Sequence, residues 1–156
     1  MRMKCLLIPF LCLLWFSANG APLAVGDAVP IISAEDQFGK EFVLTNTIQY
    51  LLVATEMPSA KAANKALANQ GGGYLEKHHA AYLMDIHTMP GVARWFAFPK
   101  MRRYPQRIVL VDSAVALAAF PSQPNCVTVL ALTPAGRILK IGYWKPDSEP
   151  LERFLR

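Results

Sequence analysis

Thiol chemistry in this chain depends on one residue once its N-terminus is set aside. Cys5 and Cys12 lie in an apolar N-terminal run, and Cys126 stands far along the chain. A reactive thiol needs a pKa lowered by a nearby base, cation or helix N-terminus. Cys126 begins a β-branched stretch and has no charged neighbour in the sequence. We interpret it as a half-buried structural residue, with redox sensing or mixed-disulfide formation as the alternative.

Soft metal ligands gather in one short stretch, which contains His78, His79, Met84, His87 and Met89. Imidazole and thioether groups could bind copper or haem. Residues 80–86 are typical of a buried strand, however, which places the histidines near its opposite ends and Met84 in a core. Because this spacing matches no metal-binding motif, we interpret the histidines as ordinary loop residues and predict no metal and no cofactor.

Two carboxylates, Asp85 and Asp112, end two predicted central strands. Open α/β sheets bind ligands at the carboxyl ends of their strands, and paired carboxylates that meet there could do acid–base work. Capping of the following segment is the simpler interpretation. The sequence has no Ser-His-Asp signature and no phosphate-binding loop. Gly71-Gly72-Gly73 follows a predicted helix rather than a strand, which argues against a dinucleotide-binding motif.

Basic and aromatic residues alternate in a stretch that contains Arg94, Trp95, Phe96, Phe98, Lys100, Arg102, Arg103, Tyr104 and Arg107. One interpretation is a partner surface, centred on Arg94, Trp95, Lys100, Arg102 and Arg103, for an acidic partner such as anionic lipid or a cell-envelope polymer. The other is an amphipathic helix with its apolar residues inside and its basic residues solvated, which we favour because long basic side chains readily reach water from such helices.

The first twenty residues have the features of a secretory signal peptide. Arg2 and Lys4 precede an apolar run over residues 5–16, and small residues follow at 17–21. Cleavage between Gly20 and Ala21 is therefore expected, with export to the periplasm. A single membrane anchor is the alternative, although the apolar run is short for a bilayer. Residues 21–156 then form one domain, without a membrane span.

Charge and cysteine content limit the kinds of partner and the covalent bonds that are expected for that domain. Removing Arg2 and Lys4 lowers the net charge from +5 to +3, which together with export argues against nucleic acid. Cys126 alone remains, so no disulfide forms within the chain. We expect a periplasmic protein or an envelope component as the partner.

Hydrophobic periodicity predicts a mixed α/β sheet flanked by helices. Apolar and alternating runs indicate strands at residues 29–34, 41–45, 49–55, 80–86, 107–112, 126–132 and 137–144. Helices are expected at residues 60–70, 91–98 and 147–156, with a short helix or loop at 113–120. Ser59 is placed to cap the first helix, and turns are expected at residues 36–40 and 133–136.

Several short motifs resemble the redoxin form of the thioredoxin-like fold, the superfamily that includes peroxiredoxins and other AhpC-TSA-like proteins. Gly26-Asp27-Ala28-Val29-Pro30 and the turn at 36–40 are similar to a redoxin start, and residues 132–138 to its final hairpin. Residues 59–64 more closely resemble a YtfJ-type group of cysteine-free periplasmic proteins. The resemblance implies a thioredoxin-like domain over residues 21–156.

The same resemblance exposes two departures. The turn where a redoxin carries its reactive cysteine reads Glu56-Met57-Pro58-Ser59, and Val127 stands where thioredoxins keep a cis-proline. These positions therefore mark a degenerate active site. We predict a redox-inactive, non-catalytic binding or accessory protein of the periplasm. The alternative is a divergent redox enzyme that uses Cys126 with glutathione or a partner's thiol.

Overall fold

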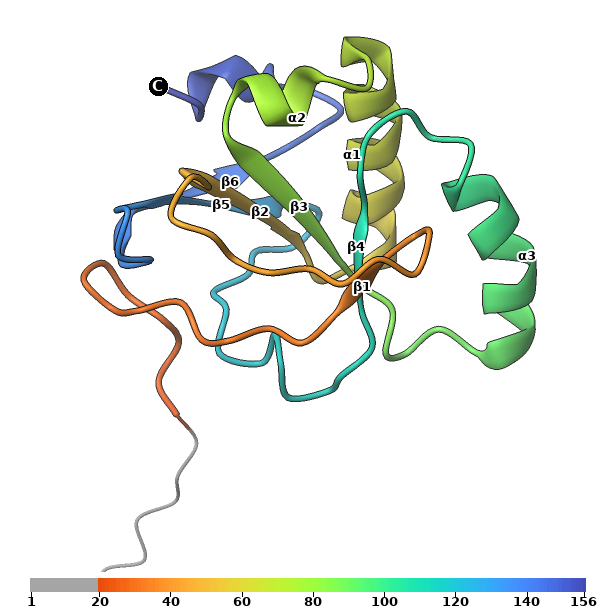
Figure 1. Ribbon diagram of the computed structural model, residues 1–156, viewed down its shortest axis with the longest axis horizontal. Coiled ribbons are helices and arrows are strands. Elements are labelled where there is room, and N and C mark those ends of the chain that lie inside the picture. Colours follow the sequence, from red (N-terminus) through yellow and green to blue (C-terminus); the bar gives the residue numbers. More distant parts are fainter. Residues whose placement is uncertain (1–19) are drawn as a thin grey trace, which may run out of the picture.

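The computed structural model describes residues 20–156, so the predicted signal peptide lies almost entirely outside the described residues. The described part of the chain contains a six-stranded sheet in the order β1-β4-β3-β2-β5-β6 (Figure 1). The strands β2, β3 and β4 run parallel to one another, whereas β1, β5 and β6 pair antiparallel to their neighbours. The strands are β1 Glu35–Asp36, β2 Tyr50–Ala54, β3 Ala80–Asp85, β4 Val109–Val111, β5 Val127–Leu132 and β6 Ile138–Trp144.

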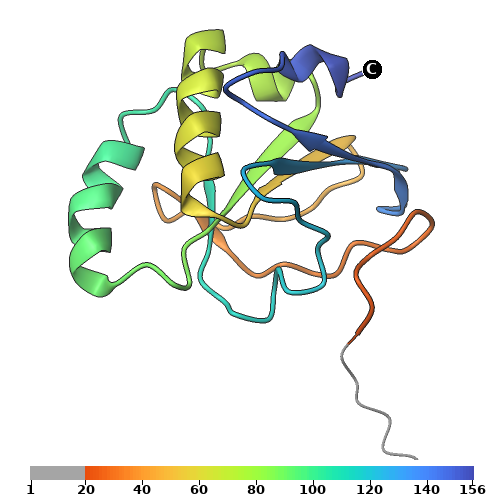
Figure 2. The same ribbon diagram turned by 180° about the vertical axis from the view of Figure 1, so that it is seen from behind.

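Helices cover one face of this sheet and irregular segments cover the other (Figure 2). The helices are α1 Met57–Gln70, α2 Tyr74–Lys77 and α3 Gly91–Met101, and a 3-10 turn, η1, spans Leu151–Arg153. Along β2 the side chains alternate, so that Leu52 packs beneath α1 while Leu51 packs on the opposite face against the segments that carry Ile32 and Phe42. The described residues thus supply a core on each face.

Helix α1 packs closely because its inner side chains are small. Ala60, Ala63 and Leu67 are buried against the sheet, and Gly71, with a φ of 92°, ends the helix. The prediction that Ser59 caps α1 is wrong. The helix begins at Met57, three residues earlier than predicted, and Ser59 lies in its first turn, where its hydroxyl donates to the Glu56 carbonyl at 2.9 Å.

The predicted strands at residues 29–34 and 41–45 are also wrong. Only Glu35 and Asp36 pair with β4, and Glu41 makes a single bridge to Glu35. This segment crosses the sheet face as irregular chain because it anchors by burying Ile32 and Phe42 rather than by extending a ladder. The turn expected at residues 36–40 is present. The Asp36 carboxylate accepts the backbone N–H groups of Phe38 and Lys40, and Gly39 has a φ of 78°.

Two helical predictions need revision. Helix α3 continues through Pro99 to Met101, and the helix expected over 147–156 is reduced to η1. Residues 113–120 form turns, which agrees with the predicted short helix or loop, and the short helix α2 was not predicted. Pro150 lacks an N–H, and the Glu149 carbonyl accepts the Trp144 indole N–H at 2.8 Å instead of a helical amide.

Candidate functional site

The carboxyl ends of the parallel strands gather the residues that the sequence singled out. β2 leads into Glu56, β3 ends at Asp85, and Asp112 follows β4. β5 runs antiparallel to β2, with Thr128 paired to Val53, so Cys126 at its start lies at the same edge. This edge is where open α/β sheets place their ligands.

The turn between β2 and α1 is closed by its own hydrogen bonds. The Glu56 carboxylate accepts the Asn125 backbone N–H at 3.1 Å, which ties the turn to the loop before β5. Ser59 is buried and its hydroxyl is committed to the Glu56 carbonyl. Met57 packs partly against the core, while Pro58 is exposed at the helix start. The Glu56–Ser59 turn, which was predicted to be a degenerate active site, therefore begins α1.

Cys126 is more deeply buried than the sequence suggested. Only 3% of its surface is exposed, and its backbone N–H donates to the Gln123 carbonyl. The preceding residue, Asn125, has a φ of 58° and is the one that reaches Glu56. The fold thus brings the thiol-bearing loop beside the β2–α1 turn, and Val127 follows as a fully buried strand residue.

Asp85 and Asp112 do not form a carboxylate pair, because each has a different partner. One Asp85 carboxylate oxygen accepts the His87 backbone N–H at 2.9 Å and contacts the His87 Nδ1 at 2.6 Å. Asp112 takes two hydrogen bonds from the Arg94 guanidinium, which hold the pKa of that carboxyl below its usual value. Asp85 thus accepts an amide of the turn that follows it, as predicted, although the N-cap of α3 itself is Pro90. In the turns after Asp112, the Ala116 amide is bonded by Ser113 instead.

Arg94 connects α3 to the segments that follow β3 and β4. Besides its two hydrogen bonds to Asp112, its guanidinium donates to the Ile86 carbonyl at 2.8 Å and to the Met89 carbonyl at 2.9 Å. These bonds use most of the donors of one guanidinium. Arg94, predicted as part of a partner surface, is therefore committed to holding α3.

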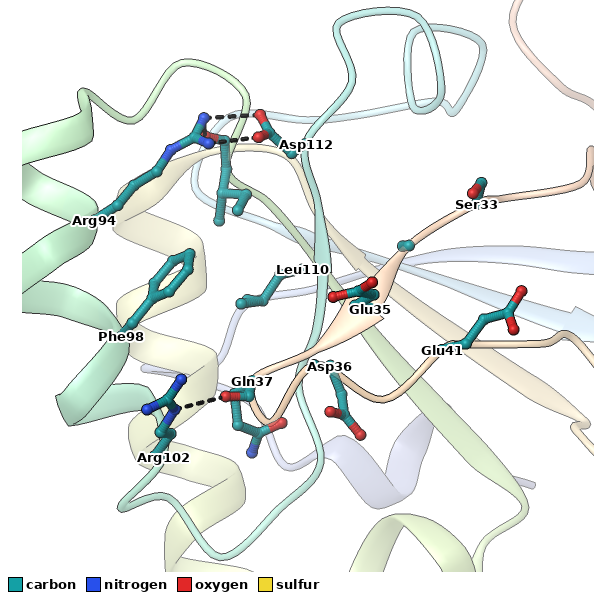
Figure 3. A pocket seen from close by; sticks show the side chains of 13 residues that line it. Ser33, Glu35, Asp36, Gln37, Glu41, Arg94, Phe98, Arg102, Leu110 and Asp112 are labelled. Carbon is teal, nitrogen blue, oxygen red and sulfur yellow. Dashed lines mark hydrogen bonds and ion pairs between the residues drawn. The ribbon is translucent and has the colours of Figure 1, made fainter.

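A groove of about 660 Å³ separates α3 from β1 (Figure 3). Arg94 and Phe98 of α3 line it together with Arg102, the residue that follows the helix, and Glu35 and Glu41 line it from the opposite side. The Arg102 Nε donates to the Gln37 carbonyl at 3.0 Å and closes one end. This groove was not predicted. The spacing 94, 98, 102 was a signal for one helix wall, but nothing in the sequence pairs that wall with Glu35 and Glu41.

Asp36 also lines the groove, and its carboxylate accepts the Arg107 Nε–H at 2.8 Å. Burial raises the pKa of Asp36. The hydrogen bonds from Lys40, Phe38 and Arg107 outweigh that effect, so the pKa lies below its ordinary value. The neighbouring Gln37 is buried, accepts the Ile108 N–H and donates to the Gln106 carbonyl. The turn is therefore rigidly tied to the start of β4.

The outer side of α3 contradicts the expectation that its apolar residues face inward. Val92 and Trp95 are each 74% exposed and Phe96 is 67% exposed, while Met101 is the one residue of α3 that is fully buried. The predicted partner surface is divided by the helix. Arg94 and Arg102 line the groove, whereas Lys100 and Arg103 are exposed and make no ion pair with the described residues.

The histidine and methionine stretch is spread along β3. His78 and His79 precede the strand and His87 follows it, while Met84 is buried and contacts the Asn64 amide. His78 stacks at 4.6 Å on Tyr74. Between residues 20 and 156, no three His, Cys, Asp or Glu side chains are grouped as metal ligands. Nor does this part of the chain contain a helix long and apolar enough to cross a bilayer.

The sequence matches no protein-family model and no curated protein. The structure is similar to a peroxiredoxin-like protein from Aquifex aeolicus, with a TM-score of 0.59 at 10% identity over 87% of this chain and 86% of that chain. It is also similar to a peroxidoxin from Mycobacterium tuberculosis, with a TM-score of 0.57 at 13% identity over 85% and 94%. A thioredoxin domain of a thiol-disulfide oxidoreductase from Bacteroides vulgatus gives a TM-score of 0.54 at 17% identity over 86% and 99%.

These likenesses and the mixed six-stranded sheet identify the fold. The chain has a thioredoxin-like fold of the redoxin type, as the sequence motifs predicted.

Proposed function

We propose that this protein is an exported, periplasmic member of the thioredoxin-like fold that acts by binding a partner rather than by thiol catalysis. We further propose that it belongs with the cysteine-free YtfJ-type proteins that residues 59–64 resemble. One observation carries the proposal: the turn that would hold a redoxin nucleophile is occupied by Glu56 and Ser59, whose side chains are bonded to Asn125 and to the helix start.

Dithiol cycling requires two thiols that can reach each other. With residues 1–20 removed, Cys126 would be the sole cysteine. The purified protein should therefore fail to reduce insulin disulfides and should consume no peroxide with a thiol donor. A thioredoxin supplies the positive control for the first assay and a peroxiredoxin for the second. Turnover that disappears in a Cys126→Ser variant would contradict the proposal.

A second candidate function is single-thiol redox chemistry at Cys126. It is favoured by the hydrogen bond between Asn125 and Glu56, which brings the Cys126 loop beside the usual redoxin site. Native alkylation distinguishes the two, with mass spectrometry locating the label on the Cys126 peptide. Because the thiol is 3% exposed, we expect slow labelling in the folded protein and fast labelling after denaturation. Fast labelling of the folded protein would support the single-thiol enzyme.

Export is tested separately by the N-terminus of the protein that cells secrete. If Ala18 and Gly20 define the cleavage site, mass spectrometry should find Ala21 first. A membrane-bound species that retains Met1 would instead support the anchor alternative.

A further inference from the structure

Helix α3 exposes most of its large apolar residues, whereas a helix that packs on a core buries them. Its outer side carries Val92, Trp95, Phe96 and Pro99, spaced i, i+3, i+4 and i+7, all of them exposed. Its inner side carries Arg94, Phe98 and Met101, which contact the groove or the core. We name the four outer residues the apolar stripe. The Trp95 and Phe96 rings meet edge to face at 4.8 Å, which makes one broad aromatic surface.

Unpaired positive charge borders the apolar stripe. Residues 88–111 contain Arg94, Lys100, Arg102, Arg103 and Arg107 and no acidic residue. Arg94 and Arg107 are neutralised by Asp112 and Asp36. Lys100 and Arg103 form no ion pair within residues 20–156 and follow the apolar stripe at its C-terminal end. Glu35 and Glu41, which form no ion pair within residues 20–156, line the groove on the side opposite α3.

We propose that the apolar stripe, Lys100 and Arg103 bind the surface of an anionic phospholipid bilayer. Tryptophan and phenylalanine beside lysine and arginine are the composition of helices that lie in the bilayer interface. Figures 1 and 2 both show α3 at one side of the molecule, and the side chains of the stripe are exposed there. Such an exposed surface suits a planar bilayer better than it suits a peptide, which would need the groove. The proposal names the partner for the binding role proposed above, on which it rests.

Trp95 provides a direct readout. In the exported protein, with its N-terminus confirmed at Ala21, the tryptophans are Trp95, which is exposed, and Trp144, which is 1% exposed and already shielded from solvent. On vesicles of phosphatidylglycerol and phosphatidylethanolamine, the emission of Trp95 should move to shorter wavelength and be quenched by nitroxide-labelled lipid. On vesicles of phosphatidylcholine, or at high salt, the shift should be much smaller because the basic residues no longer attract the surface.

Variants separate this stripe from other exposed apolar residues. Lys100→Gln together with Arg103→Gln should raise the anionic lipid concentration for half-maximal shift about tenfold, since each cation contributes to binding near the surface. Phe96→Ala should raise it too. Val115→Ser, at a site 80% exposed in the 113–120 loop, is the matched control and should leave it unchanged. Thermal unfolding of each variant shows that the fold is retained.

Three results would overturn the proposal. The first is Trp95 emission that stays constant on anionic vesicles. The second is an equal shift on neutral vesicles that Lys100→Gln with Arg103→Gln does not alter. The third is a shift that depends on protein concentration without lipid, which would assign the stripe to a second copy of the chain. None of these depends on the insulin, peroxide or alkylation assays, so the failure of this proposal and of non-catalytic binding can be told apart.

Discussion

Helices α1 and α3 follow the parallel strands β2 and β3 and are held in opposite ways. α1 is rich in alanine and lysine, yet it buries Ser59, Ala60, Ala63, Asn64 and Leu67. α3 carries valine, tryptophan and two phenylalanines, yet only Met101 is fully buried. α1 is attached by close packing over the middle of the sheet. α3 is attached by Arg94, which bonds to the segments that follow β3 and β4, and by Arg102, which bonds to Gln37 after β1.

The difference shows that burial does not follow hydrophobic content alone. Small side chains let a helix approach a sheet closely, so that Ala60 and Ala63 reach almost complete burial. Large side chains on α3 point away because Arg94 fixes which side of the helix faces the sheet. A solvent-exposed aromatic helix face costs solubility and is typical of an interaction surface.

The largest contrast should appear in stability. Leu67→Ala truncates a side chain on the inner side of α1 that is 1% exposed, and should lower the free energy of unfolding by about 3 kcal/mol. Trp95→Ala, on the outer side of α3, should change it by no more than about 0.5 kcal/mol. Equilibrium denaturation measures both. A large loss from Trp95→Ala would show that the apolar stripe has a structural partner within the chain.

As the pH is lowered, α3 and the 36–40 turn should lose stability before α1 does. The pKa values of Asp36 and Asp112 lie below their usual value, so the stabilisation from their hydrogen bonds is present above about pH 4, where unfolded aspartate titrates. It is lost as the pH falls through the folded values. Amide exchange followed by NMR should show α3 and the 36–40 turn opening at a higher pH than α1. In Asp112→Asn, α3 should already be loose at neutral pH.

Removal of the guanidinium at the sheet edge tests the attachment of α3 directly. Arg94→Met keeps the aliphatic stem but loses the bonds to Asp112, Ile86 and Met89. We expect amide exchange in α3 to quicken several-fold while α1 is unchanged. Lys100→Met is the matched control, because Lys100 is exposed on the same helix and forms no ion pair with residues 20–156. Equal exchange in both variants would mean that packing of Phe98 and Met101 suffices.

The smallest effect is expected at the start of α1. Ser59→Ala removes a hydroxyl that donates to the Glu56 carbonyl, but that carbonyl still accepts the Ala60 N–H at 3.0 Å. The free energy of unfolding should therefore change by less than about 0.5 kcal/mol. A loss of about 1 kcal/mol, the value for a true helix cap, would show that the hydroxyl has a capping role.

Much of the fold could be predicted from the sequence because its signals are local. The continuous apolar runs gave β2, β3 and β5 close to their observed bounds, and the turn motifs at 36–40 and 133–136 lie where they were expected. The missing cysteine at the β2–α1 turn is visible in the sequence itself. The secondary structure was predicted incorrectly at residues 29–34, 41–45 and 147–156. In such short runs, packing and side-chain hydrogen bonds decide whether the chain forms a strand or a helix.

Sequence alone determined the thioredoxin-like class, the order of the central elements and the lack of a thiol at the β2–α1 turn. Tertiary structure alone decided which residues meet. In the folded protein Asn125 is hydrogen-bonded to Glu56, and Asp112 is paired with Arg94 rather than with Asp85. Trp95 and Phe96 are exposed. Periodicity reports that a helix has two faces, but which face is buried depends on partners distant in the sequence. For α3 those partners are a carboxylate after β4 and two backbone carbonyls after β3. All three bind Arg94, so the side of α3 that carries Arg94 faces the sheet.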